Sequence, residues 1–300
     1  MSKYLMRSLM FVPGHNDKLL NSASRSNADV LLLDLEDSVL PIKNKKIARD
    51  KIEQWVKTGA FDKHLVFPRV NDRESGQLLK DIYQLTIEGI HGFMYPKSQK
   101  GEDVYFFDKL LETIEYEKGF KVGTFKIIPL IETAAAVLNA QEICQASSRV
   151  IAIAYGCEDF IADLEGIHDH EGQSLFVPRA MVAMAARANN IIPIDTVHIN
   201  IHNMEDLEKN LKIAKNLGFE GMLVLHPKEL PLVHEYFSPT EKEVKDAEEM
   251  LRLSEEAEKM DKGVAVLNGK FIGPPMVITA KKYLEKYKLI KEINRSNNNG

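Results

Sequence analysis

An even alternation of short apolar segments with longer helical ones constrains this fold most. Eight segments have strand-like patterns. They lie at Ser8–Val12, Asp29–Leu35, His64–Val70, Gly89–Tyr95, Phe125–Ile131, Val150–Ala154, Pro193–His198 and Gly221–Leu225. Segments with amphipathic helical spacing lie between them, at Asn16–Ser26, Lys43–Lys57, Glu74–Ile87, Gly101–Lys118, Thr133–Ala146, Val177–Asn189 and Met204–Leu217. About eight strand–helix units over roughly 230 residues match the number of units and the length of a (β/α)8 barrel.

Two further features favour a closed barrel over an open doubly wound sheet. The segments Val30–Leu35 (VLLLDL) and Lys126–Ile131 (KIIPLI) are almost continuously apolar, as in parallel strands buried on both faces. The first strand–helix turn, Val12–Asp17 (VPGHND), has one glycine where a dinucleotide-binding fold has the pattern GxGxxG. We therefore predict an α/β fold, a (β/α)8 TIM barrel with a C-terminal helical and hairpin appendage.

The last part of the chain has a different pattern. Pro239–Lys262 is charged and amphipathic, and Gly263–Ile272 indicates a hairpin around Asn268 and Gly269. This appendage is too short for a core of its own, so it is expected to pack on the barrel or on a neighbouring subunit. The predicted organisation is a barrel domain over residues 1–236, a helix–hairpin–helix lid over 237–290 and a flexible tail over 291–300.

Composition excludes several classes of function. The chain has 39 Lys and Arg against 44 Asp and Glu, a net charge of −5, which argues against nucleic acid as the main partner. No apolar run reaches the roughly 18 residues of a membrane span. Two cysteines provide no disulfide framework, and the sequence has no recognisable signal peptide, so a cytoplasmic protein is expected.

Polar residues follow almost every predicted strand. In a (β/α)8 barrel the C-terminal strand ends surround one shared opening, here called the mouth, where active sites lie. The residues at these ends are Asp34–Asp37, Arg69–Asn71, Lys97, Glu132–Thr133, Glu158–Asp159, Asp195, His198 and His226. This pattern predicts an active site at the mouth.

Glu132 and Asp159 are the clearest pair of candidate metal ligands in this set. Two carboxylates at adjacent strand ends suit Mg²⁺, which keeps positions open for substrate and water. Zinc is disfavoured because no His and Cys residues have ligand spacing. The alternative is that Glu132 caps the following helix and Asp159 begins the next one, because acids favour helix N-termini. Spacing alone leaves both interpretations open.

The other candidates at the mouth also have two interpretations each. Arg69 offers a guanidinium fork for a carboxylate or an enolate oxygen, or it forms an internal salt bridge to Glu36 or Asp37. Lys97 faces the mouth or begins a loop. Gly14 exposes backbone N–H groups near a helix N-terminus, which can bind phosphate, although a lone glycine is a weak signal.

A series of short motifs occurs in a fixed order along the chain. It comprises RSLMFVPG (Arg7–Gly14), DVLLLDLEDSV (Asp29–Val39), FPRVN (Phe67–Asn71), YPK (Tyr95–Lys97), PLIET (Pro129–Thr133), AYGCEDFIADLEG (Ala154–Gly166), IPIDTVHINI (Ile192–Ile201), LGFEGMLVLHPKEL (Leu217–Leu230) and NGKFIGPP (Asn268–Pro275). From Arg7 to about Tyr287 the chain resembles the citrate lyase β-subunit-like (CitE-like) proteins. They belong to the HpcH/HpaI aldolase superfamily, which also holds malyl-CoA and citramalyl-CoA lyases.

The resemblance implies a Mg²⁺-dependent barrel, trimeric or a multiple of a trimer, that makes or breaks a carbon–carbon bond next to an acyl thioester. It implies that Glu132 and Asp159 bind the metal and that Arg69 binds the substrate near the thioester carbonyl. Glu36 and Asp37 would support that arginine and the metal-bound water.

The resemblance also implies a thioester partner, either acyl-CoA or an acyl-carrier protein. Arg7, Gly14 and Lys18 would lie along the phosphopantetheine arm, and Lys97 is a further candidate for substrate binding. The C-terminal helices resemble a segment that covers the active site of a neighbouring subunit.

One departure from the family pattern bears on activity. Gly273 stands where lyases of this family usually have an aspartate that transfers a proton at the carbon centre. His15 and His198 are candidate replacements. The predicted function is Mg²⁺-dependent cleavage of a citryl-, malyl- or citramalyl-type thioester to an acyl-CoA and a 2-oxo acid or glyoxylate. The alternatives are a class II aldolase acting on free 2-oxo acids and a non-catalytic thioester-binding homologue.

Overall fold

The computed structural model describes residues 4–167, 172–259, 265–267 and 270–298. The chain divides into two compact units, Met1–Val233 and His234–Gly300, which are described separately. In the described part of the chain, no helix combines the length and the apolar character that crossing a membrane requires.

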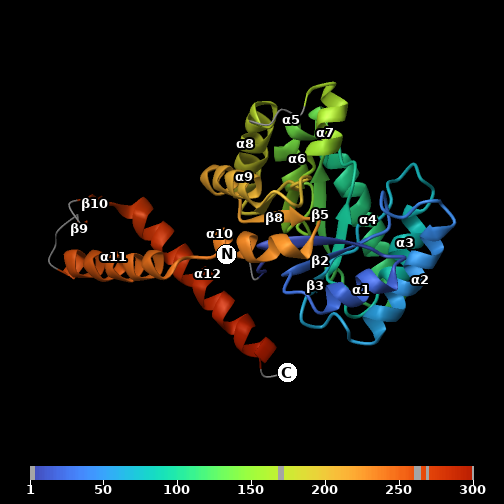
Figure 1. The fold of residues 1–300 in the computed structure, drawn as a ribbon, viewed down its shortest axis with the longest axis horizontal. Coiled ribbons are helices and arrows are strands. Elements are labelled where there is room, and N and C mark those ends of the chain that lie inside the picture. Colours follow the sequence, from blue (N-terminus) through green and yellow to red (C-terminus); the bar gives the residue numbers. More distant parts are fainter. Residues whose placement is uncertain (1–3, 168–171, 260–264, 268–269, 299–300) are drawn as a thin grey trace. The chain divides into compact units, whose positions relative to one another are not determined.

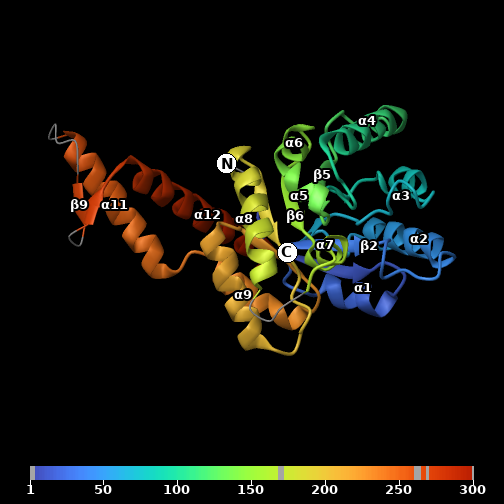
Figure 2. The same cartoon turned by 90° about the horizontal axis from the view of Figure 1, so that it is seen from above.

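Eight parallel strands form the sheet of the first unit. Their order is β3-β2-β1-β8-β7-β6-β5-β4, and Figures 1 and 2 show helices placed around the outside of the strands. The strands are β1 (Ser8–Pro13), β2 (Val30–Asp34), β3 (Leu65–Val66), β4 (Gly92–Tyr95), β5 (Lys126–Ile131), β6 (Ala152–Tyr155), β7 (Ile192–Asp195) and β8 (Gly221–Val224). This nearly closed ring confirms the predicted (β/α)8 barrel.

The segment after β3 joins the two edge strands of this sheet, β3 and β4. β3 is shorter than the predicted segment His64–Val70, because Pro68 has no N–H to donate to a ladder. Pairing nevertheless resumes beyond the proline, where the Arg69 N–H donates to the Leu33 carbonyl at 3.1 Å. Arg69 also forms a parallel bridge with Met94 of β4. The backbone of Arg69 therefore lies at the seam where the barrel closes.

Helices connect the strands, mostly within the predicted segments. They are α1 (Asp17–Ser24), α2 (Asn44–Lys57), α3 (Leu78–Leu85), α4 (Gly101–Lys118), α5 (Ala134–Leu138), α6 (Ala140–Gln145), α7 (Cys157–Leu164), α8 (Gln173–Ala188) and α9 (Met204–Leu217), followed by the 3-10 turn η1 (Pro227–Glu229) and α10 (Leu230–Phe237). The segment Glu74–Ile87, predicted as one helix, becomes helical only at Leu78, because Gly76 has a left-handed φ of 67°.

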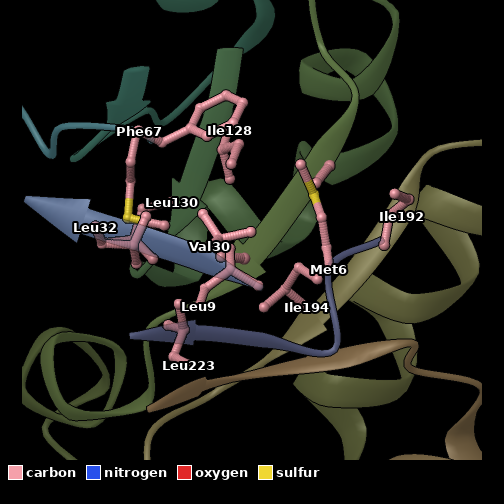
Figure 3. Close-up of a cluster of buried hydrophobic side chains, with 13 residues drawn as sticks. Met6, Leu9, Val30, Leu32, Phe67, Ile128, Leu130, Ile192, Ile194 and Leu223 are labelled. Atoms are coloured by element: carbon pink, nitrogen blue, oxygen red, sulfur yellow. The ribbon is translucent and has the colours of Figure 1, made fainter. Parts of the chain in front are cut away.

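A packed hydrophobic core fills the interior of the barrel. Figure 3 shows Leu32, Leu130 and Ile194, from three different strands, among the buried side chains of this core. Alternate residues of one strand, such as Val30 and Leu32, belong to the same cluster, which is the period-2 pattern of inward-facing positions. Because this interior is filled, a ligand has access only to the ends of the barrel.

The second unit consists of a helical pair with a hairpin. α11 (Glu241–Lys259) packs against α12 (Pro274–Asn298), and β9 (Ala265–Leu267) pairs with β10 (Lys270–Ile272) in antiparallel register (Figure 2). The expected turn at 268–269 lies outside the described residues. α12 continues to Asn298, through most of the stretch where the sequence suggests a tail. The lid and the tail remain predictions.

Gly221 provides a test of how closely β8 packs against the residues that precede β1. A Cβ atom at this position would lie 1.9 Å from the Met6 carbonyl oxygen. We expect G221A to lower the free energy of unfolding by about 2–3 kcal/mol, because the backbone has to move. Denaturant unfolding measures this change. G166A is the matched control, since the nearest atom there is 3.4 Å away; equal losses in the two variants would contradict the described packing.

Candidate active site

The C-terminal ends of the strands surround a cavity of about 460 Å³. Its charged lining residues, here called the polar wall, are Asp34, Asp37, Arg69, Glu132, Glu158 and Asp159. Its large apolar lining residues, here called the apolar wall, are Phe11, Leu130, Val197, Ile199, Leu223 and Leu225. The structure thus brings four of the predicted site residues, Asp37, Arg69, Glu132 and Asp159, to one cavity.

Arg69 is held by three carboxylates that follow one another along the chain. Its Nε and Nη2 donate to the two carboxylate oxygens of Asp34 at 2.7 and 2.8 Å. Its Nη1 lies 2.9 Å from Glu36 Oε2 and 3.0 Å from Asp37 Oδ2. Burial raises the pKa of Asp34, but the charge and hydrogen bonds of Arg69 outweigh it and hold this pKa below its usual value. The guanidinium is therefore fixed in place on the polar wall.

This geometry is compatible with both interpretations of Arg69, as a ligand-binding group and as a partner in internal salt bridges. The internal salt bridges exist, and the guanidinium still lines the cavity and lies 4.8 Å from the centroid of the Phe11 ring. Asp34 is the residue that sequence reasoning missed. The sequence marks it as a strand-end acid and indicates no role for it, whereas in the structure it supplies the bidentate pair. Its position as the last residue of an apolar strand was the available signal.

Glu36 is a buried carboxylate that is only partly paired. Its Oε1 accepts no hydrogen bond from the residues that the structure describes, and the Lys97 ammonium is 3.4 Å away. Burial raises the pKa of Glu36 to about 7, with a further increase from Asp37 and only partial compensation by Arg69. This carboxyl group therefore changes its protonation state near neutral pH.

Glu132 is held in the polar wall by the backbone N–H of Lys97 and has room there because residue 156 is glycine. It follows β5 and is 2% exposed, and its Oε1 accepts the Lys97 N–H at 2.6 Å. Lys97 has a left-handed φ of 53°, an uncommon conformation for a residue with a side chain. A Cβ at Gly156 would lie 3.0 Å from Glu132 Cβ, so glycine there leaves room for this side chain. The Lys97 side chain is half exposed, and its role in substrate binding remains a prediction.

Electrostatic repulsion links Glu132 to the carboxylates around it. Burial raises the pKa of Glu132 to about 8, and the charges of Glu36 and Asp159 add to the increase. Burial and the charge of Asp37 likewise raise the pKa of Asp159, which lies in the first turn of α7. The polar wall therefore concentrates negative charge that a cation would stabilise.

The alternative interpretation, in which Glu132 and Asp159 serve helix N-termini, has a different outcome for each residue. Thr133, not Glu132, caps α5, since its Oγ1 accepts the Ala136 N–H at 3.1 Å. Asp159 does occupy the first turn of α7, which is compatible with both interpretations. Within the described residues, no three His, Cys, Asp or Glu side chains form a ready metal cage. Two carboxylates suffice for Mg²⁺ when substrate and water supply the other ligands.

The predicted thioester-binding residues lie in different places. Arg7 precedes β1, at the barrel end opposite the mouth, and is bound by Asp29 at 2.7 and 2.9 Å. Six strand residues, about 20 Å, separate it from the mouth, and its role in thioester binding remains a prediction. Gly14 lies at the mouth, but its N–H donates to the Asp34 carbonyl at 2.9 Å. Lys18 is exposed in the first turn of α1, and its role remains a prediction.

The two histidines suggested as proton-transfer groups lie outside the cavity wall. His15 Nδ1 is buried, with no hydrogen-bond partner among the described residues. His198 is 4% exposed, and its Nδ1 lies 3.6 Å from Asp206 Oδ2. The structure therefore gives neither histidine direct contact with a ligand in the cavity.

The Asp34–Arg69 pair predicts a large effect on stability. In D34N the buried guanidinium loses its bidentate carboxylate and retains Glu36 and Asp37. We expect the free energy of unfolding to fall by about 3 kcal/mol. D50N is the control, because the Lys46–Asp50 pair is exposed and contributes less than about 0.5 kcal/mol. Urea unfolding of both variants measures the difference, and a D34N protein as stable as D50N would refute this assignment.

The raised pKa values of Glu36 and Glu132 predict a pH dependence for the metal-free protein. Both carboxyls favour the protonated form in the folded state, with pKa values of about 7 and 8. Their stabilising effect is complete below about pH 4.5 and is lost as the pH rises through 7 and 8. We expect the Tm in chelator to fall from pH 6 to 8.5. E132Q should reduce this slope and the exposed-site variant E102Q should not; an unchanged slope in E132Q would contradict the assignment.

Comparison with known proteins supports the resemblance seen in the sequence. A family model described as HpcH/HpaI aldolase/citrate lyase matches residues 7–227. The citrate lyase subunit beta of Haemophilus influenzae is 34% identical over 95% of this chain and 97% of its own. An L-malyl-CoA/beta-methylmalyl-CoA lyase of Cereibacter sphaeroides is 31% identical over 89% of each chain. A solved structure of CitE from Mycobacterium tuberculosis, in complex with magnesium, acetoacetate and coenzyme A, has a TM-score of 0.74 at 23% identity, covering 96% of this chain and 100% of that one. The chain belongs to the HpcH/HpaI aldolase/citrate lyase family.

Proposed function

We propose that this protein is a Mg²⁺-dependent carbon–carbon lyase that cleaves a 3-hydroxyacyl thioester of the citryl, malyl or citramalyl type. The products are an acyl thioester and a 2-oxo acid or glyoxylate. The observation that carries this proposal is the presence of Glu132, Asp159 and a fixed Arg69 on the wall of one open cavity. Relatives named as citrate lyase subunit beta and as malyl-CoA lyase support the reaction class.

The donor set fits a hard divalent cation. Glu132 and Asp159 offer oxygen ligands, and burial raises both pKa values, with further increases from the charges of Glu36 and Asp159 at Glu132 and of Asp37 at Asp159. Mg²⁺ prefers such oxygens and keeps coordination positions for water and substrate. When bound here, it would supply Lewis-acid polarisation of the hydroxyl and carboxylate oxygens of the substrate. Magnesium in the M. tuberculosis CitE complex is consistent with this assignment.

Arg69 supplies the second electrostatic element of the proposal. Cleavage between the second and third carbons of the acyl chain leaves negative charge on the thioester oxygen. A fixed guanidinium opposite that oxygen stabilises this charge by about 3 kcal/mol per donor. Asp34, Glu36 and Asp37 prevent the guanidinium from turning away, so Asp34 acts as a positioning residue beside the two predicted supports.

Glu132 depends on a similar set of positioning groups. The Lys97 N–H holds one of its carboxylate oxygens, and the absence of a side chain at Gly156 leaves space beside the other. These contacts fix the carboxylate without using a charged side chain. Its charge therefore remains available to a cation.

The proposal extends to the carrier of the acyl group and to the assembly of the protein. We include acyl-CoA or an acyl-carrier thioester as the substrate, with Gly14, Lys18 and Lys97 as candidates near the carrier arm. Homotrimer formation and a lid formed by residues 237–290 remain predictions. The coenzyme A in the M. tuberculosis CitE complex supports a thioester ligand.

The direct test is a cleavage screen with malyl-, citramalyl- and citryl-thioesters, with and without Mg²⁺ and with product identification. We expect Mg²⁺-dependent cleavage of at least one thioester. E132Q and D159N should each reduce kcat/KM about 100-fold or more, because the Lewis-acid contribution is worth several kcal/mol. E102Q, an exposed change on α4, should retain the activity. Cleavage that is unaffected by chelator or by E132Q would refute the proposal.

The glycine at position 273 favours a second candidate function, that of a thioester-binding protein without lyase activity. A Cβ at Gly273 would meet Phe271 at 3.4 Å and Pro275 at 3.7 Å, so the local structure accepts a side chain there. Tight thioester binding without turnover, unchanged in G273D, would select this candidate. Turnover that appears only in G273D would instead indicate lyase chemistry that lacks its proton-transfer group. Activity on free pyruvate and an aldehyde, unaffected by CoA, would select a class II aldolase.

A further inference from the structure

We infer that helix α2 positions the polar wall from outside the cavity, through two cations that lie one helical turn apart. Lys45 holds the loop between β2 and α2, which carries Asp37. Arg49 holds the segment after Arg69, through a carboxylate of α3. Both are positioning residues, because neither belongs to the residues that line the cavity. This inference rests on the proposed function, since it gives these two side chains a part in the reaction.

The Lys45 ammonium is bound to the backbone of the loop that follows β2. Its Nζ donates to the Leu35 carbonyl at 2.8 Å and to the Glu36 carbonyl at 2.6 Å. Lys45 lies in the first turn of α2 and is only 7% exposed. A buried ammonium is stable only when hydrogen bonds replace those that it loses to water. The lysine and the loop therefore fix each other's position.

The two carbonyls that Lys45 binds belong to the part of the loop that reaches Arg69. The Leu35 N–H donates to the Arg69 carbonyl at 3.0 Å. The Val39 N–H donates at the same distance to the Glu36 carbonyl, which also accepts a hydrogen bond from Lys45. The Glu36 side chain reaches Arg69, with Oε2 lying 2.9 Å from Nη1. A displacement of this loop therefore moves its carboxylates relative to the guanidinium.

The charge of Lys45 also acts on the acids of this loop. Burial lowers the pKa of Lys45, while the charges of Asp34 and Glu36 oppose the decrease. The same attraction stabilises both carboxylates when Lys45 is protonated. Arg69 is shared among three acids, so a second cation near them reduces their mutual repulsion. Because Lys45 lies outside the cavity wall, it does so without occupying the space of a ligand.

Arg49 supports the other segment of the polar wall in a corresponding way. Its Nη1 donates to Asp81 Oδ1 at 2.8 Å, and the two side chains are 6% and 0% exposed. Asp81 Oδ2 accepts the backbone N–H of Asn71 at 2.9 Å and the amide Nδ2 of the same residue at 2.7 Å. Asn71 comes two residues after Arg69. The buried carboxylate therefore ties the end of the seam segment to α2 and α3.

The two cations lie on one face of α2. Lys45 and Arg49 are four residues apart, so their side chains leave the helix in nearly the same direction. α2 packs against α3, as Figures 1 and 2 show. One helix therefore holds both the loop that carries the acids and the segment that carries the guanidinium. This arrangement keeps the charged groups of the site in place before a ligand arrives, as electrostatic catalysis requires.

Lys118 provides a matched control for Lys45. It is the last residue of α4, and its ammonium donates to the Tyr83 and Thr86 carbonyls. Burial lowers the pKa of Lys118, as it does that of Lys45. Helices of a (β/α)8 barrel run back from the mouth, so α4 ends at the opposite end of the barrel. K118M therefore removes the same kind of contact as K45M at a place remote from the polar wall.

The first experiment measures amide hydrogen exchange by NMR in the metal-free, full-length protein. In K45M we expect the Leu35 and Val39 amides to exchange at least about 10-fold faster than in the wild type, because the loop opens locally. K118M should leave both rates unchanged. K45Q keeps a hydrogen-bond donor without the charge, and it takes the place of K45M should that variant fail to fold. Unchanged rates in whichever of the two variants folds would overturn the inference.

The second experiment measures kcat and KM for the thioester that the wild type cleaves. We expect K45M to lower kcat about 30-fold or more and to change KM less than about 3-fold, because displaced charges act mainly on the transition state. K118M should keep the wild-type kcat. K45R, which retains the charge and the donors, should recover at least about 10-fold of the loss.

The outcomes separate this inference from the proposed function. A wild-type kcat in K45M would overturn the inference and leave the lyase function intact. If the wild type cleaves no thioester, the lyase function is refuted. The exchange rates then decide by themselves whether α2 holds the loop.

The contact made by Arg49 has a matched pair of its own. D81N leaves one acceptor oxygen where Arg49 and Asn71 use two. E115Q is the control, because Glu115 is a buried carboxylate bound by Arg149, which precedes β6 at the opposite end of the barrel. We expect D81N to speed the exchange of the Asn71 amide and to lower kcat, each about 10-fold, and E115Q to do neither. R49K, which loses the guanidinium fork, serves should D81N fail to fold. Equal effects at the two ends of the barrel would overturn the role of Arg49.

Discussion

The contact between Arg69 and the three acids after β2 connects the barrel to its site. The backbone of Arg69 bridges β2 and β4 at the seam of the barrel, and its side chain binds Asp34, Glu36 and Asp37. Closing the barrel therefore places a guanidinium at the mouth and surrounds it with carboxylates in one step. Backbone bonds of Arg69 hold the seam and its side-chain ion pairs hold the guanidinium, so one residue serves both.

Arg69 does not neutralise the whole polar wall. Its positive charge is shared among three acids, while Glu132 and Asp159 stand beside them with raised pKa values. Repulsion among buried carboxylates can be relieved by protons or by a cation. Protons serve this purpose at low pH, and a divalent cation serves it at neutral pH. The metal-free instability at high pH and the affinity for Mg²⁺ would then have one electrostatic origin.

The sequence predicts the barrel because its signals are local and repeated: apolar strands such as Val30–Leu35 recur at a regular distance. It also predicts which residues gather at the mouth, because parallel strand ends share one edge. It cannot rank side chains by their contacts: no local pattern shows that Asp34 supplies the bidentate pair for Arg69, or that Asp29 binds Arg7 at the opposite end of the barrel. Both outcomes depend on pairings across strands that local patterns do not contain.

The two walls of the cavity divide the work of the site. The polar wall holds groups that citryl-, malyl- and citramalyl-type thioesters would all need, since each of them has a hydroxyl, a thioester oxygen and a carboxylate on the hydroxyl-bearing carbon. The apolar wall combines Phe11 of β1 and Leu130 of β5 with residues of β8 and of the loops after β7 and β8, and the Phe11 ring lies 4.8 Å from the Arg69 guanidinium. Ile199 and Leu225 line the cavity and are 53% and 41% exposed, so a ligand that fills the cavity would cover apolar surface on both.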